Sequence, residues 1–249
     1  MPVSDVTGDL PRIIRNDERL YEGDLTLYFR TLFFKSRNLH NPYHNFRHML
    51  HLLWLCHQAC RYYQNRLTPR QMRDLLIAAL FHDFDHPGHP HPHEADPDRI
   101  NIPIAIAGLR RCTMPADRAF LPQIEALIEA THYPYKIGSD KLDLLGQIIR
   151  DADLAQALSP AWIQQVVFGL AQEWEVPLLE VLKGQGSRFL PAFCSPRVGR
   201  SACSPKNLSK QRLRKLNSCC GCLTRCRPAQ LSISVLRGAP DYSRRRPPR

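Results

Sequence analysis

Histidine and aspartate side chains gather in two short stretches of this chain. The first stretch, residues 41–51, reads NPYHNFRHMLH, and the second, residues 79–89, reads ALFHDFDHPGH. Ten of the 11 histidines among the 249 residues fall between His40 and His93. Imidazole suits zinc, iron and manganese ions, and a carboxylate can bridge two metal ions. The two stretches therefore predict a metal site.

The first stretch opens a predicted helix. Apolar residues recur at helical spacing through YHNFRHMLHLLWLCHQACRYY. Residues four apart share one face of a helix, so we expect His44 and His48 to project together. His51 follows about one turn later. Three imidazoles are thus predicted along this helix.

A second helix delivers the other motif. It is predicted to begin at Thr68, with the hydroxyl as a cap and Pro69 in the first helical position. It must stop before the Pro-Gly pair at 87–88. At the end of this helix, His82 and Asp83 are predicted to place an imidazole and a carboxylate side by side. Because Asp83 follows the apolar run LIAALF, we expect it to be desolvated, and a buried lone carboxylate is costly unless paired or metal-bound.

A third segment, DLLGQIIRDADLAQAL, offers a further carboxylate. Asp153 shares a helix face with Leu145 and Ile149, which predicts that it points inward and pairs with a metal. Asp151 is the alternative ligand. Each of these polar side chains, taken alone, is also explained by ordinary hydrogen bonding. Their joint occurrence on adjoining apolar helices favours the metal site.

Helical periodicity extends over residues 24–183, and strand alternation between hairpin turns is missing. The predicted fold class is all-α. Proline interrupts every longer window after Gly184. From Pro191 onward 14 Lys and Arg face one acid, whereas the rest of the chain, with 20 bases and 22 acids, is nearly neutral.

Residues 184–249 therefore form a basic tail rich in Cys, Pro and Arg, which we expect to be unstructured. Several interpretations stay open. CCGCLTRC could be a zinc knuckle, although it lacks a well-spaced fourth ligand. A basic arm could bind nucleic acid or anionic lipid by charge alone. The segment could also be a shifted reading frame or an ordinary disordered extension.

HNPYHNFRH followed by ALFHDFDHPG resembles the HD superfamily of metal-dependent phosphohydrolases. Within that superfamily, the two motifs are similar to the catalytic domain of class I cyclic nucleotide phosphodiesterases. The resemblance covers about residues 25–158. It implies an HD/PDEase-like helical bundle with two divalent metal ions (Zn, Mg, Mn or Fe) at the base of a pocket. It divides the chain into an N-terminal extension at 1–23, a catalytic domain at 24–183 that is shorter than the family pattern, and the tail.

The resemblance also implies roles for individual residues. His48, His82, Asp83 and Asp153 match the ligands of the tighter metal, and Asp83 would bridge to a second metal held mainly by water. A hydroxide bridging the two metals would attack phosphorus. His44 matches the histidine that protonates the leaving oxygen, and a histidine can be partly protonated near pH 7.

Four further residues are given supporting roles. Asp85 and His86 match positions that orient ligands and bound water. His132 has two interpretations, contact with the second metal or phosphate, or a structural hydrogen bond at a helix end. Asn101 is expected to cap the helix that follows it. The glutamine and aromatic clamp with which the family recognises a base are not matched to residues of this chain.

These observations predict a phosphoric ester hydrolase that converts 3′,5′-cyclic nucleotides into 5′-monophosphates. The alternatives are a nucleotidase or other phosphomonoesterase of the HD superfamily, and a metal-bound but inactive binding module. The expected partner is a small-molecule phosphate ester, with no specific nucleic acid and no organic cofactor. Without a secretory signal or an apolar run of about 18 residues, we expect a cytoplasmic chain with no membrane span.

Overall fold

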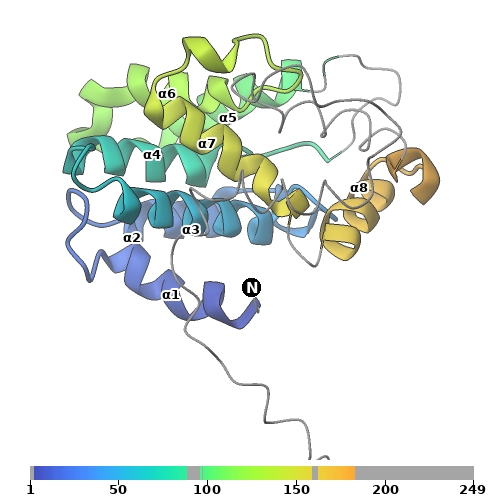
Figure 1. Ribbon diagram of the computed structural model, residues 1–249, viewed down its shortest axis with the longest axis horizontal. Coiled ribbons are helices and arrows are strands. Elements are labelled where there is room, and N and C mark those ends of the chain that lie inside the picture. The colour runs from blue at the N-terminus through green and yellow to red at the C-terminus, as the bar shows by residue number, and fades with distance from the viewer. Residues whose placement is uncertain (1–2, 89–95, 97, 159–161, 183–249) are drawn as a thin grey trace, which may run out of the picture. The chain divides into compact units, whose positions relative to one another are not determined.

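The computed structural model describes residues 3–88, 96, 98–158 and 162–182 (Figure 1). The chain divides into two units, Met1–Val198 and Gly199–Arg249, and every described residue belongs to the first. The predicted tail at 184–249 thus lies outside the described residues. Helices and turns without any strand make up the described part, which confirms the predicted all-α class.

The helices follow one another through connections of varied length. The α-helices are α1 (Val3–Arg15), α2 (Thr26–Lys35), α3 (Phe46–Tyr62), α4 (Pro69–Phe81), α5 (Asp98–Cys112), α6 (Leu121–Ala130), α7 (Leu144–Leu154) and α8 (Phe168–Glu173). Short 3₁₀ segments lie at η1 (Asn38–His40), η2 (Pro115–Phe120), η3 (Ser139–Lys141) and η4 (Ala155–Leu158), and η5 (Ile163–Val167) is a π-helical segment.

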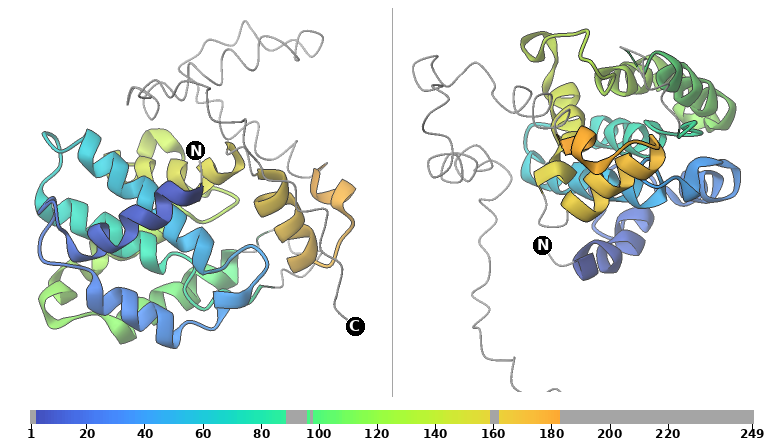
Figure 2. Two further views of the ribbon diagram at one scale, coloured as in Figure 1. Left: turned by 90° about the horizontal axis from the view of Figure 1, so that it is seen from below. Right: turned by 90° about the vertical axis from the view of Figure 1, so that its right-hand side faces the viewer.

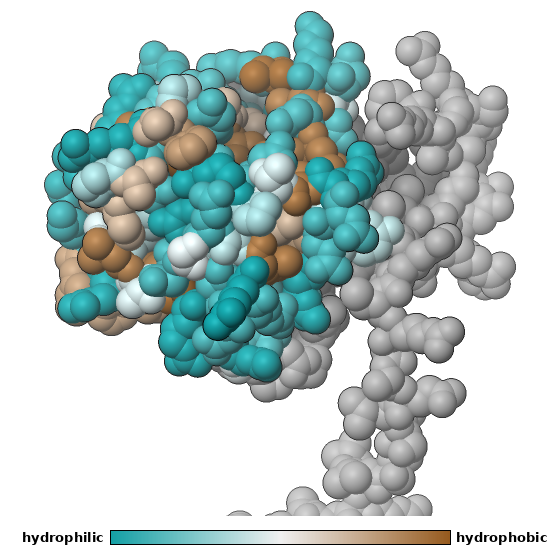
Figure 3. Space-filling model, turned by 90° about the vertical axis from the view of Figure 1, so that its left-hand side faces the viewer, coloured by the Kyte–Doolittle hydropathy of each residue, from teal (hydrophilic) through white to brown (hydrophobic). Residues whose placement is uncertain are grey.

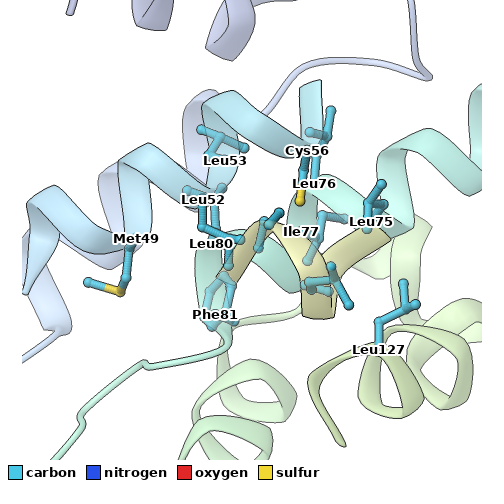
Figure 4. Close-up of a cluster of buried hydrophobic side chains, with 14 of the residues drawn as sticks. Met49, Leu52, Leu53, Cys56, Leu75, Leu76, Ile77, Leu80, Phe81 and Leu127 are labelled. Atoms are coloured by element: carbon cyan, nitrogen blue, oxygen red, sulfur yellow. The ribbon is translucent and has the colours of Figure 1, made fainter. Parts of the chain in front are cut away.

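Helices α3 and α4 form the centre of the bundle, side by side in Figure 1. Helices α1 and α7 pack against α3, and α2, α5, α6 and α7 pack against α4. Figure 4 shows the apolar side chains between them, among them Leu53, Leu76, Phe81 and Leu127. A short connection joins α3 and α4, so the start of α3 lies beside the end of α4. This close-packed centre supports the two histidine motifs.

Helix α1 contributes to the same core. Its Leu10, Ile13 and Ile14 are buried within the main hydrophobic cluster. The hydroxyl of Tyr21 donates a hydrogen bond to the backbone oxygen of Ile13. The stretch 1–23, which the sequence sets apart as an extension, therefore supplies part of the packing around α3.

Local sequence signals set the helix starts. Thr68 and Gln71 form a capping box at the start of α4, as the Thr-Pro pair predicts. Asn45 caps α3, because its side chain accepts hydrogen bonds from two backbone N–H groups of the first turn. Asp143 caps α7, because its side chain accepts a hydrogen bond from the backbone N–H of Gly146.

A buried ion-pair network fixes α4 to η2. The carboxylate of Asp117 is fully buried and accepts hydrogen bonds at 2.8 Å from Nε and Nη2 of Arg73. Nη1 of Arg70 and the hydroxyl of Tyr28 also donate to this carboxylate, at 2.7 and 2.8 Å. Four hydrogen bonds thus satisfy the buried charge, which would otherwise be costly.

A second, smaller cluster of buried apolar residues surrounds α8. Val166, Val167 and Leu170 are buried together there, and Tyr43 packs against them. The cluster includes α8, which Figure 2 shows from two further directions. Its packing on Tyr43 brings α8 next to the beginning of α3.

One face of the described part of the chain is largely polar. On the face shown in Figure 3, hydrophilic side chains predominate and apolar residues appear in small groups. None of the helices described in the structure combines the length and the apolar character needed to cross a bilayer.

Candidate metal and acid–base site

Four side chains from three helical segments converge at the junction of α3, α4 and α7. Nε2 of His48 lies 3.1 Å from Oδ1 of Asp153 and 3.3 Å from Oδ2 of Asp83. Nε2 of His82 lies 3.0 Å from the same Asp83 oxygen and 3.6 Å from the same Asp153 oxygen. The two Nε2 atoms are 3.2 Å apart. The family resemblance implies these four residues as ligands, and the fold brings them to one point.

The outer ring nitrogens determine which atoms face that point. Nδ1 of His48 lies 2.8 Å from the side-chain oxygen of Gln156, and Nδ1 of His82 lies 3.0 Å from the backbone oxygen of Ala79. An oxygen accepts, so both Nδ1 atoms carry a proton. In the neutral rings, both Nε2 lone pairs are then aimed inward, which is how metal-binding histidines are held.

The donor set fits a divalent cation. Oδ2 of Asp83 is buried and has no hydrogen-bond partner among the described residues. Two facing lone pairs and two carboxylates repel one another unless a proton or a metal ion lies between them. Histidine and carboxylate ligands are those that zinc, iron and manganese accept.

The pKa shifts of these residues also indicate that a positive charge is favoured between them. Burial lowers the pKa of His48, but its hydrogen bond to Asp153 and its close contact with the charged Asp83 outweigh burial and hold that pKa well above the usual value. Burial raises the pKa of Asp83, whereas the charge of His82 and the neighbouring histidine contacts bring it well below the usual value. A proton on His48 therefore balances the carboxylates when no metal is bound.

His44 lies beside this cluster but not on the helix. Asn45 is the cap of α3, so His44 precedes the helix that was predicted to carry it. Its ring centre is 6.0 Å from that of His48. The prediction that the helix includes His44 was therefore wrong, because α3 begins after Asn45, although the two rings still lie near each other.

A carboxylate that the sequence argument missed holds His44 in place. Oε1 of Glu173 on α8 makes a short hydrogen bond with Nδ1 of His44, and Oε2 accepts from the backbone N–H groups of Tyr43 and His44 at 2.8 and 3.0 Å. Glu173 is only 1% exposed. No local signal marks it, because its partners lie far away in the sequence.

These contacts set the charge of the pair. Burial lowers the pKa of His44, but the charge of Glu173 and the hydrogen bond to it outweigh burial, so the pKa is raised. Burial raises the pKa of Glu173, and the charge and hydrogen bond of His44 bring it below the usual value. Nε2 of His44 has no hydrogen-bond partner among the described residues. The arrangement is a cationic imidazole that is anchored at Nδ1 and has no described partner at Nε2.

His86 stacks against His44 and stays neutral. The two ring centres are 3.8 Å apart and the planes differ by 12°. Burial, followed by the charge of His44, lowers the pKa of His86 to about 3. The N–H of Gly88 donates to Nδ1 of His86, and Nε2 contacts the side-chain amide of Asn101. Asn101 was expected to cap a helix, but it lies inside α5 and contacts this ring instead.

His44, His86 and Glu173 also lie close enough together to be considered as a metal site. The oxygens of Glu173 are already occupied by three N–H groups, and both nitrogens of His86 have partners. Glu173 and His86 are thus satisfied by hydrogen bonds, whereas the cluster around Asp83 has a buried oxygen with no described partner. We therefore interpret the group of His44, His86 and Glu173 as the acid–base part of the site.

Several predicted residues lie elsewhere. His51 stacks on Trp54, and burial lowers its pKa to about 4. Nε2 of His132 lies 2.7 Å from Oδ1 of Asp96, which agrees with the structural-hydrogen-bond interpretation. Asp151 is exposed on α7. Oδ1 of Asp85 accepts from the backbone N–H of Arg37.

Comparison with known proteins concerns the same part of the chain. Residues 43–95 match the family model of 3′5′-cyclic nucleotide phosphodiesterases. No curated protein is similar enough to match. The chain therefore resembles the class I phosphodiesterase catalytic domain over a segment that contains both histidine motifs, as those motifs predicted. Asp153 and Glu173 lie beyond the matched segment.

Proposed function

We propose that this chain is a metal-dependent phosphohydrolase that opens 3′,5′-cyclic nucleotides to 5′-monophosphates with water as the nucleophile. The observation that carries the proposal is the meeting of four ligand atoms at the Asp83 carboxylate beside an anchored, cationic His44. The family match at 43–95 supports the same class of reaction.

In this proposal His48, His82, Asp83 and Asp153 hold the tighter of two divalent ions, which are Zn, Mg, Mn or Fe. Divalent ions bound at such a site neutralise phosphate charge and lower the pKa of bound water toward neutrality. The protein's own part is orientation. Gln156 and the backbone of Ala79 fix both histidine rings, and Nε2 of Gln156 bonds to Gln165 at 3.0 Å.

His44 is the proposed general acid. Cleavage of the ester leaves an alkoxide, which needs a proton as it departs. Nδ1 of His44 is held by Glu173, so Nε2, which has no partner in the described part of the chain, is the atom that gives the proton. The negative charge of Glu173 keeps His44 protonated near neutral pH, and the neutral His86 beneath it adds no competing charge.

A substrate screen of the full chain tests the proposal. The protein is stripped with a chelator, reloaded separately with manganese, magnesium, zinc or iron, and supplied with cyclic AMP, cyclic GMP, 5′-mononucleotides or a generic diester. We expect metal-dependent formation of 5′-monophosphates from the cyclic nucleotides, and none in the stripped protein.

Two outcomes contradict the proposal in different ways. Release of inorganic phosphate from mononucleotides, with cyclic nucleotides left intact, indicates a phosphomonoesterase. Stoichiometric metal binding without hydrolysis of any ester indicates a binding module.

A further inference from the structure

Hydrogen bonds join the loop between α2 and α3 to the segment that carries the His-Asp motif. The side-chain nitrogen of Asn38 donates to the backbone oxygens of His44 and Asp83, both at 2.8 Å. Asn38 is only 1% exposed. One amide group thus bridges the beginning of the first motif and the centre of the second.

Neighbouring contacts add to this bridge. The backbone N–H of Arg37 donates to Oδ1 of Asp85 at 2.9 Å, and the side chain of Asn41 donates to the backbone oxygen of His86 at 3.0 Å. Asp85 has a φ of +60°, a left-handed conformation that is unfavourable for most residues and that here turns the chain between Asp83 and His86. The loop therefore holds the turn between Asp83 and His86 through two further hydrogen bonds.

The orientation of the Asn38 amide is fixed from its other end. Its oxygen and the hydroxyl of Ser36 form a short hydrogen bond, which leaves the amide nitrogen directed at the two carbonyl groups. Both carbonyls belong to residues of the proposed site. A change in the amide would let the two backbone segments move relative to each other.

We propose that Asn38 is a positioning residue that sets the distance between the His44–His48 segment and the His82–Asp83 segment, and thereby the affinity for metal. The inference rests on the metal site of the proposed function. Asn38 itself contacts neither metal ligand atoms nor substrate. Residues that orient metal ligands typically change metal affinity by about 10- to 100-fold when they are replaced.

The chain offers a matched control in Asn16. Its side-chain nitrogen also donates to two backbone oxygens, of Tyr21 at 2.5 Å and of Gly23 at 2.7 Å, and its oxygen accepts from the N–H of Leu20 at 2.8 Å. This asparagine holds the loop after α1, and none of its partners belongs to the proposed site. It performs the same local task without any link to the metal ligands.

The test compares Asn38→Asp with Asn16→Asp. Each substitution keeps the shape of the side chain and replaces the donating nitrogen by an oxygen that repels the two carbonyls. We measure the dissociation constant of Mn²⁺ by titration without substrate, and the urea unfolding midpoint without metal. Both variants are expected to unfold at lower urea, but only Asn38→Asp is expected to bind Mn²⁺ about 10- to 100-fold more weakly.

A second variant covers the case in which Asn38→Asp does not fold. Ser36→Ala removes the hydroxyl that orients the amide and keeps Asn38 itself, so a smaller loss of Mn²⁺ affinity in the same direction is expected. The inference is overturned if Asn38→Asp and Asn16→Asp bind Mn²⁺ with equal affinity. If Asn38→Asp does not fold, an unchanged Mn²⁺ affinity in Ser36→Ala overturns it.

The readout separates this inference from the proposed function. Weaker Mn²⁺ binding in Asn38→Asp supports the inference even if the wild-type protein hydrolyses no ester. Normal hydrolysis by the wild type, with equal Mn²⁺ affinity in both variants, overturns the inference alone. A wild-type protein that binds none of manganese, magnesium, zinc and iron overturns the inference and removes the metal site on which the proposed function depends.

Discussion

Glu173 holds both the ring and the backbone of His44, although 129 residues separate them in the sequence. One carboxylate oxygen accepts from the imidazole, and the other accepts from two consecutive backbone N–H groups. Helix α8 therefore decides the orientation and the charge of the residue that we propose as the general acid.

Replacing Glu173 by glutamine tests this relationship. The raised pKa of His44 means that its proton is present at neutral pH and is lost as the pH rises through that pKa. Glu173→Gln removes the charge that raises it, so the alkaline limb of the pH–rate profile should move to lower pH. We expect the turnover number at pH 8 to fall by about 10²-fold. Glu180→Gln, an exposed acid further along the chain, should match the wild type, and an unmoved alkaline limb in Glu173→Gln contradicts the assignment.

The ligand and acid roles are separable by metal analysis. His82→Ala removes one of the nitrogens at the Asp83 carboxylate, so we expect loss of both bound metal and activity. His44→Ala should retain the metal and lose about 10²- to 10⁴-fold in turnover, because it removes only proton transfer. His51→Ala serves as the control, since His51 stacks on Trp54. Metal content and activity are measured on the same samples, and full activity of His44→Ala toward an unactivated ester would falsify the acid role.

Gly108 allows a test of how α5 supports the His-Asp motif. A Cβ atom at Gly108 would lie 2.3 Å from the ring of Phe84, which is buried directly after Asp83. Gly108→Ala must displace this ring, and we expect a loss of about 1–3 kcal/mol in the free energy of unfolding together with weaker metal binding. Gly8→Ala meets nothing within 4 Å and should stabilise the protein by about 0.5–1 kcal/mol through helix propensity. Urea unfolding measures both, and equal effects would contradict the packing argument.

Because the carboxylate of Asp117 is buried and ion-paired, we expect the free energy of unfolding to fall at acid pH. Burial raises the pKa of its carboxyl, but hydrogen bonds from Arg73, Arg70 and Tyr28 prevail and hold the pKa at about 2. A lowered pKa stabilises the fold above the unfolded value near pH 4, and this contribution is lost as the pH falls through about 2. The difference corresponds to about 2 kcal/mol.

The measurement is urea unfolding at a series of pH values between 5 and 2. Asp117→Asn leaves two arginines without their shared carboxylate, so it should be less stable than the wild type at pH 5 by about 3–5 kcal/mol. The gap should narrow by about 2 kcal/mol as the pH approaches 2. A gap that does not change with pH would show that Asp117 does not titrate in this range.

Much of the fold was readable from local sequence. The Thr68–Pro69 start and the apolar periodicity predict α4 because capping and propensity act within one helical turn. The same locality places His82 and Asp83 at the end of α4, and the spacing of Asp153 from Leu145 predicts an inward carboxylate. These ligand roles stay predictions, but the residues do meet.

Local spacing failed where a cap or a distant partner decided the outcome. Helical periodicity predicted that α3 extends back to His44. The helix instead begins after Asn45, whose side chain caps it by accepting hydrogen bonds from backbone N–H groups of the first turn. His51 is one turn from His48, yet it packs on Trp54. Asparagine is a common helix cap, which led to the prediction for Asn101. Its side-chain amide instead contacts the ring of His86, and only the packing of α5 brings the two residues together.

The sequence by itself determined the helical class, the start of α4 and the chemical types at the site, because those depend on neighbours within a few residues. Tertiary structure alone decided that Glu173 charges His44, that Gln156 orients His48 and that Asn38 joins the two motifs. Each of these is a hydrogen bond between groups far apart along the chain or on different loops, and such bonds form only after apolar packing has fixed the helices.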